Sequence, residues 1–222
     1  MIPDLTAYNV IDLTLTYDEG IAGYAAKEAR KLETDGWNAK TLSIYAHAGT
    51  HMDAPLHFGM EGTIDAFTPV QLMGPAWIAQ LEPIEPAALI RPEDLGEIRE
   101  RAVAGDSLLL RTGWSRFVSD PDLFRNRLPR VSPELAQWCV DTGIRMLGVE
   151  PPSVADVNNQ DEVTRIHRLL FAGKVIIVEG LTNLAAIVQP KVLLIALPLK
   201  ISGGDGAPAR VIALESKIPV SG

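Results

Sequence analysis

Three of the four histidines in this chain lie within residues 47–57, and an aspartate stands between them. The segment reads His47-Ala-Gly-Thr-His51-Met-Asp53-Ala-Pro-Leu-His57. Imidazole nitrogens and carboxylate oxygens are ligands of Zn²⁺ and Mn²⁺ in proteins, and two histidines with one carboxylate leave coordination positions open for water and substrate. The spacing therefore predicts a metal site that carries out chemistry.

An alternation of polar and apolar side chains predicts how these ligands are positioned. Residues 41–52 alternate as a half-buried strand does, which places His47, His51 and Asp53 on one face. Pro55 then ends the strand, because proline cannot donate to a ladder of hydrogen bonds. We expect the three side chains to converge above the sheet while the apolar face packs on the core.

Two other interpretations of the histidines need to be considered. A single histidine on a strand is more often a hydrogen-bonded structural residue than a ligand, but several imidazoles around one carboxylate have no evident packing purpose. A helix would also bring histidines together at i and i+4, and Gly49 and Thr50 disfavour a helix here. His57 lies past the strand end, where a histidine near a metal ion can carry protons because its pKa is close to neutral.

The rest of the chain alternates between predicted strands and helices. We predict helices over residues 91–104, 132–141 and 158–171, a short charged helical stretch around 25–32, and further strands over residues 10–15, 76–81, 107–111, 144–149, 174–179, 192–197 and 211–214. This order is typical of an α/β or α+β fold with a mixed sheet. No repeat, low-complexity tract or linker divides the chain, so we expect one domain over residues 1–222.

Composition limits the partners and the compartment. The chain has 20 basic and 28 acidic side chains and a net charge of −8, which disfavours nonspecific binding to nucleic acid or anionic membranes. Cys139 is the single cysteine, which excludes an intramolecular disulfide and fits a reducing compartment. The start lacks a signal-peptide pattern, and the apolar runs are too short to span a bilayer. We expect a cytoplasmic protein that acts on a small molecule.

The segment 47–57 resembles the signature of the cyclase-like metal-dependent hydrolases, a family that includes bacterial kynurenine formamidase and isatin hydrolase. The family pattern H-x-G-T-H-x-D-x-P-x-H is matched at every fixed position. Asp12-Leu-Thr is similar to the family's opening strand, residues 167–183 to its second ligand block, and residues 197–210 to its C-terminal loop. The resemblance thus extends over nearly the whole chain.

This resemblance implies a metal site with one or two divalent ions per chain, Zn²⁺ or Mn²⁺. A first ion would be bound by His47, His51 and Asp53. Asp53 would bridge to a second ion held by His167, on a predicted helix, and Glu179, at the end of an apolar strand. By themselves, without the resemblance, these last two residues are weak candidates, since solvated carboxylates are also common at strand ends.

The resemblance also implies a fold and a reaction. The fold would be a compact α/β domain with a mixed, barrel-like β-sheet flanked by helices, of the swivelling β/β/α type, assembled as a homodimer or homotetramer. Metal-bound hydroxide would cleave a carbon–nitrogen bond, other than a peptide bond, of an aryl formamide or a cyclic amide or imide, as in an arylformamidase or isatin hydrolase. His57 would give and take the proton.

The expected substrate contacts are aromatic. Kynurenine formamidases carry a Trp-Pro-Gly-Asp-like stretch after the first strand, and this chain departs from that pattern at residues 16–20. Tyr17 is expected to take the place of the aromatic residue that packs on the substrate ring. Phe58, directly after His57, offers a second apolar face.

Several alternatives remain open at the level of sequence. The same metal site would serve a lactone hydrolase, a lyase or an isomerase. His51 and Asp53 with distant His167 could form the 2-His-1-carboxylate triad of a non-haem iron oxygenase, and a closed four-ligand site would only stabilise the fold. A serine or cysteine nucleophile is disfavoured, because the chain has no G-x-S-x-G motif and Cys139, on a predicted helix, is expected to be a core thiol.

Overall fold

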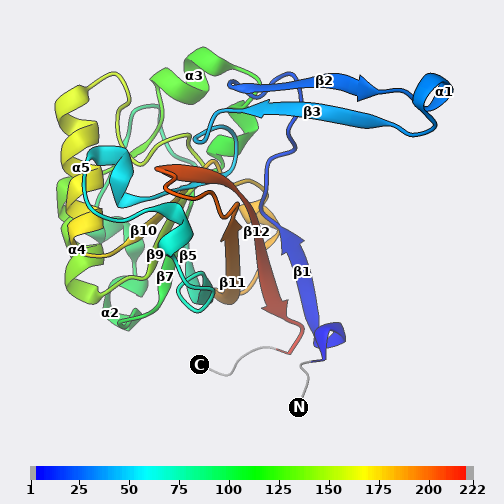
Figure 1. The fold of residues 1–222 in the computed structure, drawn as a ribbon. Helices are drawn as coiled ribbons and strands as arrows, with labels where there is room; N and C mark the ends of the chain where they lie inside the picture. Colours follow the sequence, from blue (N-terminus) through cyan, green and yellow to red (C-terminus); the bar gives the residue numbers. More distant parts are fainter. Residues whose placement is uncertain (1–3, 219–222) are drawn as a thin grey trace.

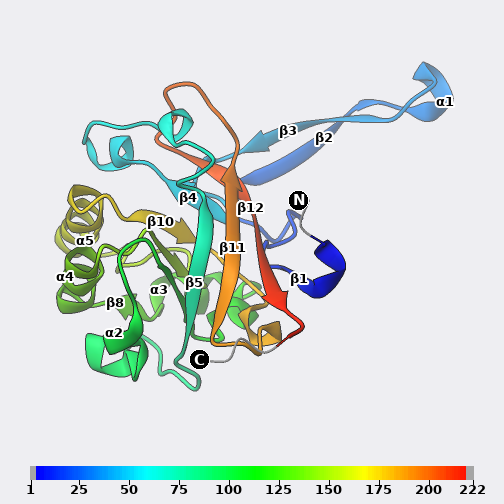
Figure 2. The same cartoon turned by 90° about the horizontal axis from the view of Figure 1, so that it is seen from below.

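The central β-sheet of the protein closes on itself. In the computed structural model, which describes residues 4–218, seven strands follow in the order β12–β11–β5–β7–β9–β10–β4, and β4 pairs back with β12 (Figure 1, Figure 2). Strand β12 pairs near its end with β1, which extends the sheet beyond the barrel. The strands are β1 Tyr8–Asp12, β4 His51–Asp53, β5 Met73–Gln80, β7 Ser107–Arg111, β9 Met146–Val149, β10 Ile176–Glu179, β11 Lys191–Pro198 and β12 Gly206–Ser216.

The barrel has a parallel half and an antiparallel half. Strands β5, β7, β9 and β10 run parallel, whereas β4, β11 and β12 pair antiparallel with their neighbours. Parallel strands are buried on both faces and therefore consist of continuous apolar runs. In β7, Leu109 belongs to the core inside the barrel, while Leu108 and Leu110 pack in a second core under the helices.

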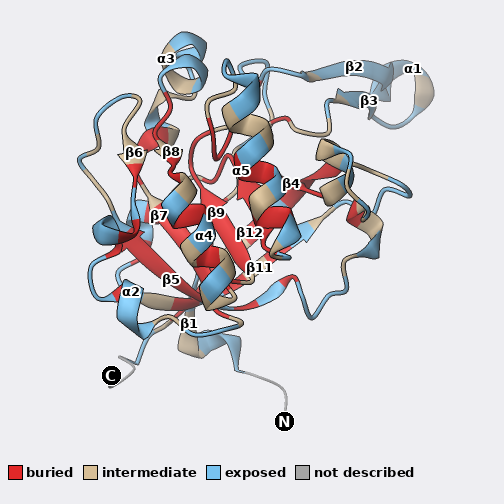
Figure 3. Cartoon of the chain, turned by 90° about the vertical axis from the view of Figure 1, so that its left-hand side faces the viewer, coloured by how far each residue is buried: buried red, intermediate tan, exposed pale blue. Residues whose placement is uncertain are grey.

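Two helices cover the parallel half, α4 Pro133–Thr142 and α5 Gln160–Ala172 (Figure 3). The side chain of Ser132 caps α4 by accepting from the Leu135 amide, as its position before Pro133 favours. Asn159 caps α5 in the same way by accepting from the Glu162 amide. The apolar side of each helix faces the sheet, and this arrangement fixes which face of α5 turns toward the end of β10.

Short elements make up the connections. Helices α2 Ile98–Arg101 and α3 Pro121–Asn126 and a parallel pair formed by β6 Leu89–Ile90 and β8 Arg130–Val131 lie at the periphery. The 3-10 helices are η1 Leu5–Ala7, η2 Pro55–Phe58, η3 Ile64–Ala66, η4 Pro92–Leu95, η5 Trp114–Phe117 and η6 Leu184–Ala186. The predicted helix over 91–104 is wrong as a continuous element, because Gly96, at φ +55°, separates η4 from α2.

A two-stranded arm projects from the barrel (Figure 1). It consists of β2 Tyr24–Arg30 and β3 Ala39–Ile44, paired antiparallel, with the short helix α1 Leu32–Asp35 at its tip. The charged helical stretch predicted around residues 25–32 is therefore wrong, since most of it forms β2. We refer to residues 24–44, the two strands with α1 between them, as the arm.

The predicted strand over residues 41–52 is also wrong as one element. Strand β3 ends at Ile44, and β4 starts only at His51. Between them the Ala48 amide donates to the Tyr45 carbonyl and Gly49 adopts φ +58°, so the chain turns sharply. The alternation in the sequence belongs to two strands in two different sheets.

The fold class predicted from sequence is confirmed. The chain is a mixed α/β domain whose closed, mixed barrel is flanked by helices. Within residues 4–218, none of the helices has the length and apolar character that crossing a membrane requires.

Candidate metal centre

The shortest barrel strand carries two of the predicted ligands. His51 and Asp53 are two residues apart in β4, so the pleat turns both side chains to the same face. Both are almost completely buried. Strand β4 pairs with β10 so that His51 lies opposite Glu179, and the His51 Nε2 is 3.2 Å from the Glu179 Oε2. The cross-strand register thus brings a third predicted ligand into place.

Helix α5 adds His167 from above the sheet. Its Nε2 lies 3.4 Å from the Glu179 Oε1 and 3.5 Å from the Asp53 Oδ2. The position follows from helical periodicity, because His167 is on the same buried side of α5 as Leu170 and Phe171. A polar residue on this apolar side is buried only because the carboxylates beneath it provide partners.

His47 reaches the same cluster from the turn between the arm and β4. Its Nδ1 lies 2.8 Å from the Asp53 Oδ1. The ring also approaches the backbone of β12 so closely that a Cβ on Gly206 would lie 2.5 Å from its Cε1. The turn at Gly49, rather than a shared strand face, therefore brings His47 to the other ligands.

The five side chains form two overlapping donor groups that suit a divalent cation. One consists of His47, His51 and Asp53 and the other of Asp53, His167 and Glu179; in each, the donor atoms lie within 4.8 Å of one another. The Asp53 Oδ2 is buried and has no hydrogen-bond partner among the described residues. Leaving a buried carboxylate oxygen unpaired costs free energy, and a bound cation would remove that cost. The residues fit a metal ion.

The pKa values show how strongly these groups interact. Burial lowers the pKa of His47, but contacts with Asp53 and Asp205 outweigh it and raise that pKa to about 9. Burial also lowers the pKa of His167, but contacts with Asp53 and Glu179 outweigh it and raise that pKa to about 10. Both carboxyl groups keep pKa values below their ordinary range despite burial, because the imidazoles face them. The cluster therefore holds two buried anions that require positive charge nearby.

His57 lies next to the cluster but apart from the two carboxylates at its centre. It belongs to η2, which begins with Pro55, and its ring stacks on His47 with 3.8 Å between centroids. The side chain is 27% exposed, against 1% for His51. Burial is the main influence on the pKa of His57 and lowers it, which favours the neutral ring.

The two predicted aromatic contacts occupy different surroundings. Phe58 stacks on the His167 ring, with 4.3 Å between centroids, and meets His57 edge-on. Tyr17 packs beneath the turn at Gly49 and donates its hydroxyl hydrogen to the Ala48 carbonyl. Phe58 thus borders the cluster, whereas Tyr17 supports the turn that carries His47.

Asp205 was not among the residues singled out from sequence. Its Oδ2 lies 3.0 Å from the His47 Nε2 and 3.5 Å from the His57 Nδ1, and these three residues form a further group of close donor atoms. The only sequence signal was the similarity of residues 197–210 to the family's C-terminal loop, which assigned no function to this carboxylate.

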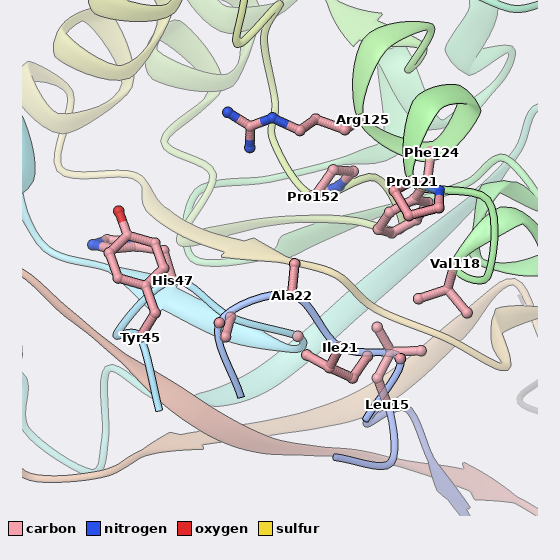
Figure 4. Close-up of a pocket in the computed structure, with 14 residues that line it drawn as sticks. Leu15, Ile21, Ala22, Tyr45, His47, Val118, Pro121, Phe124, Arg125 and Pro152 are labelled. Atoms are coloured by element: carbon pink, nitrogen blue, oxygen red, sulfur yellow. The ribbon is translucent and has the colours of Figure 1, made fainter. Parts of the chain in front are cut away.

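A pocket of about 240 Å³ opens beside His47 (Figure 4). Its walls are largely apolar and include Ile21 from the segment before the arm and Phe124 from α3. Tyr45 and His47 stand at one end. Arg125, also on α3, carries the only fixed charge among the described residues that line the pocket, and its side chain is exposed. The candidate metal centre thus adjoins a space suited to a small, largely apolar molecule.

Residues 11–156 match the model of a protein family described as "Putative cyclase". The chain belongs to this cyclase family. Kynurenine formamidase from Salinibacter ruber (strain DSM 13855 / M31) is 32% identical over 183 residues, which cover 82% of each chain. The family recognised from the signature at residues 47–57 is thereby confirmed.

Solved structures share the cyclase-family fold. Isatin hydrolase A from Labrenzia aggregata, in a structure with bound benzyl benzoate, superimposes with a TM-score of 0.86 at 24% identity, over 96% of this chain and 95% of that one. A protein described as a potential metal-dependent hydrolase with cyclase activity superimposes with a TM-score of 0.76 at 28% identity, over 96% and 100% of the two chains. The protein is an enzyme, a hydrolase that acts on carbon–nitrogen bonds other than peptide bonds.

Proposed function

We propose that this enzyme hydrolyses the amide bond of a small aryl formamide, or of a cyclic amide or imide, with the help of bound Zn²⁺ or Mn²⁺. The main observation behind the proposal is the buried Asp53 Oδ2, which has no hydrogen-bond partner among the described residues and belongs to a cluster of five potential metal ligands. The largely apolar pocket beside His47 supports a small organic substrate rather than a polymer.

The five ligands would hold one or two ions. His47, His51 and Asp53 would hold the first, and Asp53, His167 and Glu179 the second. A divalent cation in such a site lowers the pKa of a water molecule toward about 7 and polarises a carbonyl oxygen. Two dications balanced by two carboxylates would leave excess positive charge, which stabilises an oxyanion in the transition state.

His57 would move the proton. A general base must be deprotonated before the reaction, and burial keeps the pKa of His57 below its ordinary value. The neutral ring can accept a proton from the attacking water and return it to the leaving nitrogen. Its stacking on His47 holds it beside the metal ligands, and its partial exposure leaves room for a substrate.

The pocket would hold the body of the substrate. Apolar walls that include Ile21 and Phe124 favour an aromatic or aliphatic ring, and a ring bound there would place an attached carbonyl near His47. We keep the prediction that Phe58 and Tyr17 contribute to this recognition. Phe58 would act at the edge of the site, while Tyr17, whose hydroxyl is tied to the backbone, would act through the turn above it.

The proposal includes the assembly and compartment expected from sequence. Leu32, Trp37 and Leu42 are exposed large apolar residues on the arm, and an isolated two-stranded hairpin is at best marginally stable in water. Covering the arm in a homodimer or homotetramer would stabilise it. A cytoplasmic location and residues 1–222 as one functional domain complete the proposal.

A hydrolysis screen on metal-stripped and reconstituted protein tests the function. The protein is stripped with a chelator, reloaded with Zn²⁺ or Mn²⁺, and assayed with N-formyl anilides, isatin, aliphatic lactones and peptides. We expect metal-dependent turnover of the formanilides or isatin and none of the peptides. Turnover of lactones alone would show that the enzyme hydrolyses esters rather than amides, and a requirement for O₂ would indicate an iron oxygenase.

A further inference from the structure

Each metal-ligating histidine needs a second partner, because the ring nitrogen that does not bind the ion must be held in place. In His51 the Nε2 faces the carboxylates, and the Nδ1 lies 3.0 Å from the Gly49 carbonyl oxygen. In His167 the Nε2 again faces inward, and the Nδ1 lies 2.7 Å from the Val163 carbonyl oxygen. A carbonyl can only accept, so in both rings the Nδ1 donates its hydrogen, and in the neutral ring the Nε2 carries the lone pair that would bind a metal ion.

His47 has the opposite orientation and a different kind of partner. Its Nδ1 faces the cluster, 2.8 Å from the Asp53 Oδ1, and its Nε2 points outward to the Asp205 Oδ2 at 3.0 Å. We propose that Asp205 is a positioning residue that accepts the Nε2 hydrogen of His47 and so leaves the Nδ1 to bind the metal ion. This inference rests on the proposed function, since it requires that the cluster binds a metal.

The backbone fixes Asp205 for this role. The Asp205 carbonyl accepts from the Ala54 amide at 2.8 Å, and the next residue, Gly206, is paired with Asp53. The carboxylate therefore leaves the chain at a fixed point beside the ligands on β4. Because Gly206 has no Cβ, the His47 ring can lie against this backbone with its Nε2 in reach of the carboxylate.

The same oxygen of Asp205 also faces the predicted proton carrier. It is 3.5 Å from the His57 Nδ1, and the His57 and His47 rings are stacked with an interplanar angle of 24°. At 3.5 Å the contact with His57 is too long for a strong hydrogen bond. Removing the Asp205 charge should therefore mainly weaken binding of the metal ion held by His47, and it should change proton transfer by His57 less.

The proposal is tested by measuring the Zn²⁺ affinity of the Asp205→Asn variant and of the wild type. The substitution preserves shape but removes the charge that fixes the His47 tautomer, and loss of such an outer partner weakens metal binding by about 10- to 100-fold. We expect the dissociation constant for Zn²⁺, measured against a competing chelator, to rise by that factor while metal stoichiometry stays unchanged. The matched control is Asp65→Asn, which alters a carboxylate that accepts from the Gly203 amide in the same loop region and should change affinity less than about twofold.

A second measurement does not depend on any variant of Asp205. In the zinc-loaded wild type, nitrogen NMR of His47 should show a metal-bound Nδ1 and a protonated Nε2. A metal-bound Nε2, or an unchanged zinc affinity in Asp205→Asn, would overturn the proposal. Loss of a whole equivalent of zinc in Asp205→Asn would also overturn it, because Asp205 would then be a ligand itself. If the wild type binds no metal, the proposed function fails, and that outcome is distinct from all of these.

Discussion

The inner and outer halves of the candidate metal centre are built differently. The inner half, His51, Asp53, His167 and Glu179, comes from two barrel strands and a helix, and its side chains are at most 4% exposed. The outer half, His47, His57 and Asp205, comes from a turn, the short 3-10 helix η2 and a loop, and its side chains are 8%, 27% and 47% exposed. Regular structure holds the inner groups in place, whereas the more exposed outer half, of which His47 lines the pocket, lies on connecting segments, where binding and catalytic groups are often found. Variants of the two halves should therefore fail in different ways.

The largest effect is expected at the residue shared by both donor groups. Asp53→Ala should lose metal and turnover together, because Asp53 contributes to both proposed ions. Elemental analysis and the formanilide or isatin assay measure the two losses, with circular dichroism to verify the fold. If the variant kept full metal and full turnover, the assignment of the inner half would be wrong.

At His57, in the outer half, activity and metal content should separate. His57→Ala should retain bound metal and lose about 10²- to 10⁴-fold in kcat, the usual contribution of general acid–base catalysis. Elemental analysis of the same sample provides the control. Metal content that fell in parallel with the rate would make His57 a ligand and remove the distinction between it and the inner groups.

Metal binding should release protons from both halves. In the metal-free protein, His47 and His167 hold their protons up to pKa values of about 9 and about 10, and each must lose one to bind an ion. Affinity for Zn²⁺ should therefore rise with pH, by about tenfold per pH unit for each proton released, and level off above these pKa values. Competition with a chelator at pH 7 and at pH 8 measures this change in Zn²⁺ affinity. A pH-independent affinity would mean that these imidazoles are already neutral.

The smallest effect should lie at the rim of the pocket. Arg125 is exposed, so its attraction for a substrate anion is worth about 1 kcal/mol or less, or up to about fivefold in KM. Arg125→Ala should raise KM for a carboxylate-bearing formanilide by that factor and leave KM for neutral formanilide unchanged. Arg127→Ala, on the residue after α3, is the control. Equal changes for both substrates would exclude a role for the charge.

The same contrast explains what could be predicted from the sequence. The inner ligands lie on regular elements: the two-residue periodicity of a strand correctly places His51 and Asp53 on one face, and helix α5 was predicted nearly to its ends. His47 was grouped with them for a wrong reason, since the strand breaks at the turn containing Gly49. Local alternation cannot reveal which of two sheets a strand joins, because that depends on distant pairing partners.

Local sequence patterns could not assign a role to Asp205. It reaches His47 only because β12 pairs with β4 across more than a hundred and fifty residues, a contact that local patterns do not encode. His167 and Glu179 were similarly weak candidates until the family resemblance connected them. The pairing of β10 with β4 and the packing of α5 supply the physical reason for that connection.

The three residues of β4 both close the barrel and provide two proposed ligands, so binding of an ion would be coupled to the pairing of β4 with its two neighbouring strands. Opening this pairing would require release of the ion. At a free concentration one hundred times its dissociation constant, an ion that binds only the closed form adds about 2.7 kcal/mol to the cost of opening. Such openings permit hydrogen–deuterium exchange at the paired amides of residues 51–53 and 177–179. Binding of the ion would then slow this exchange by about a hundredfold, and it would leave the exchange rate of the arm unchanged.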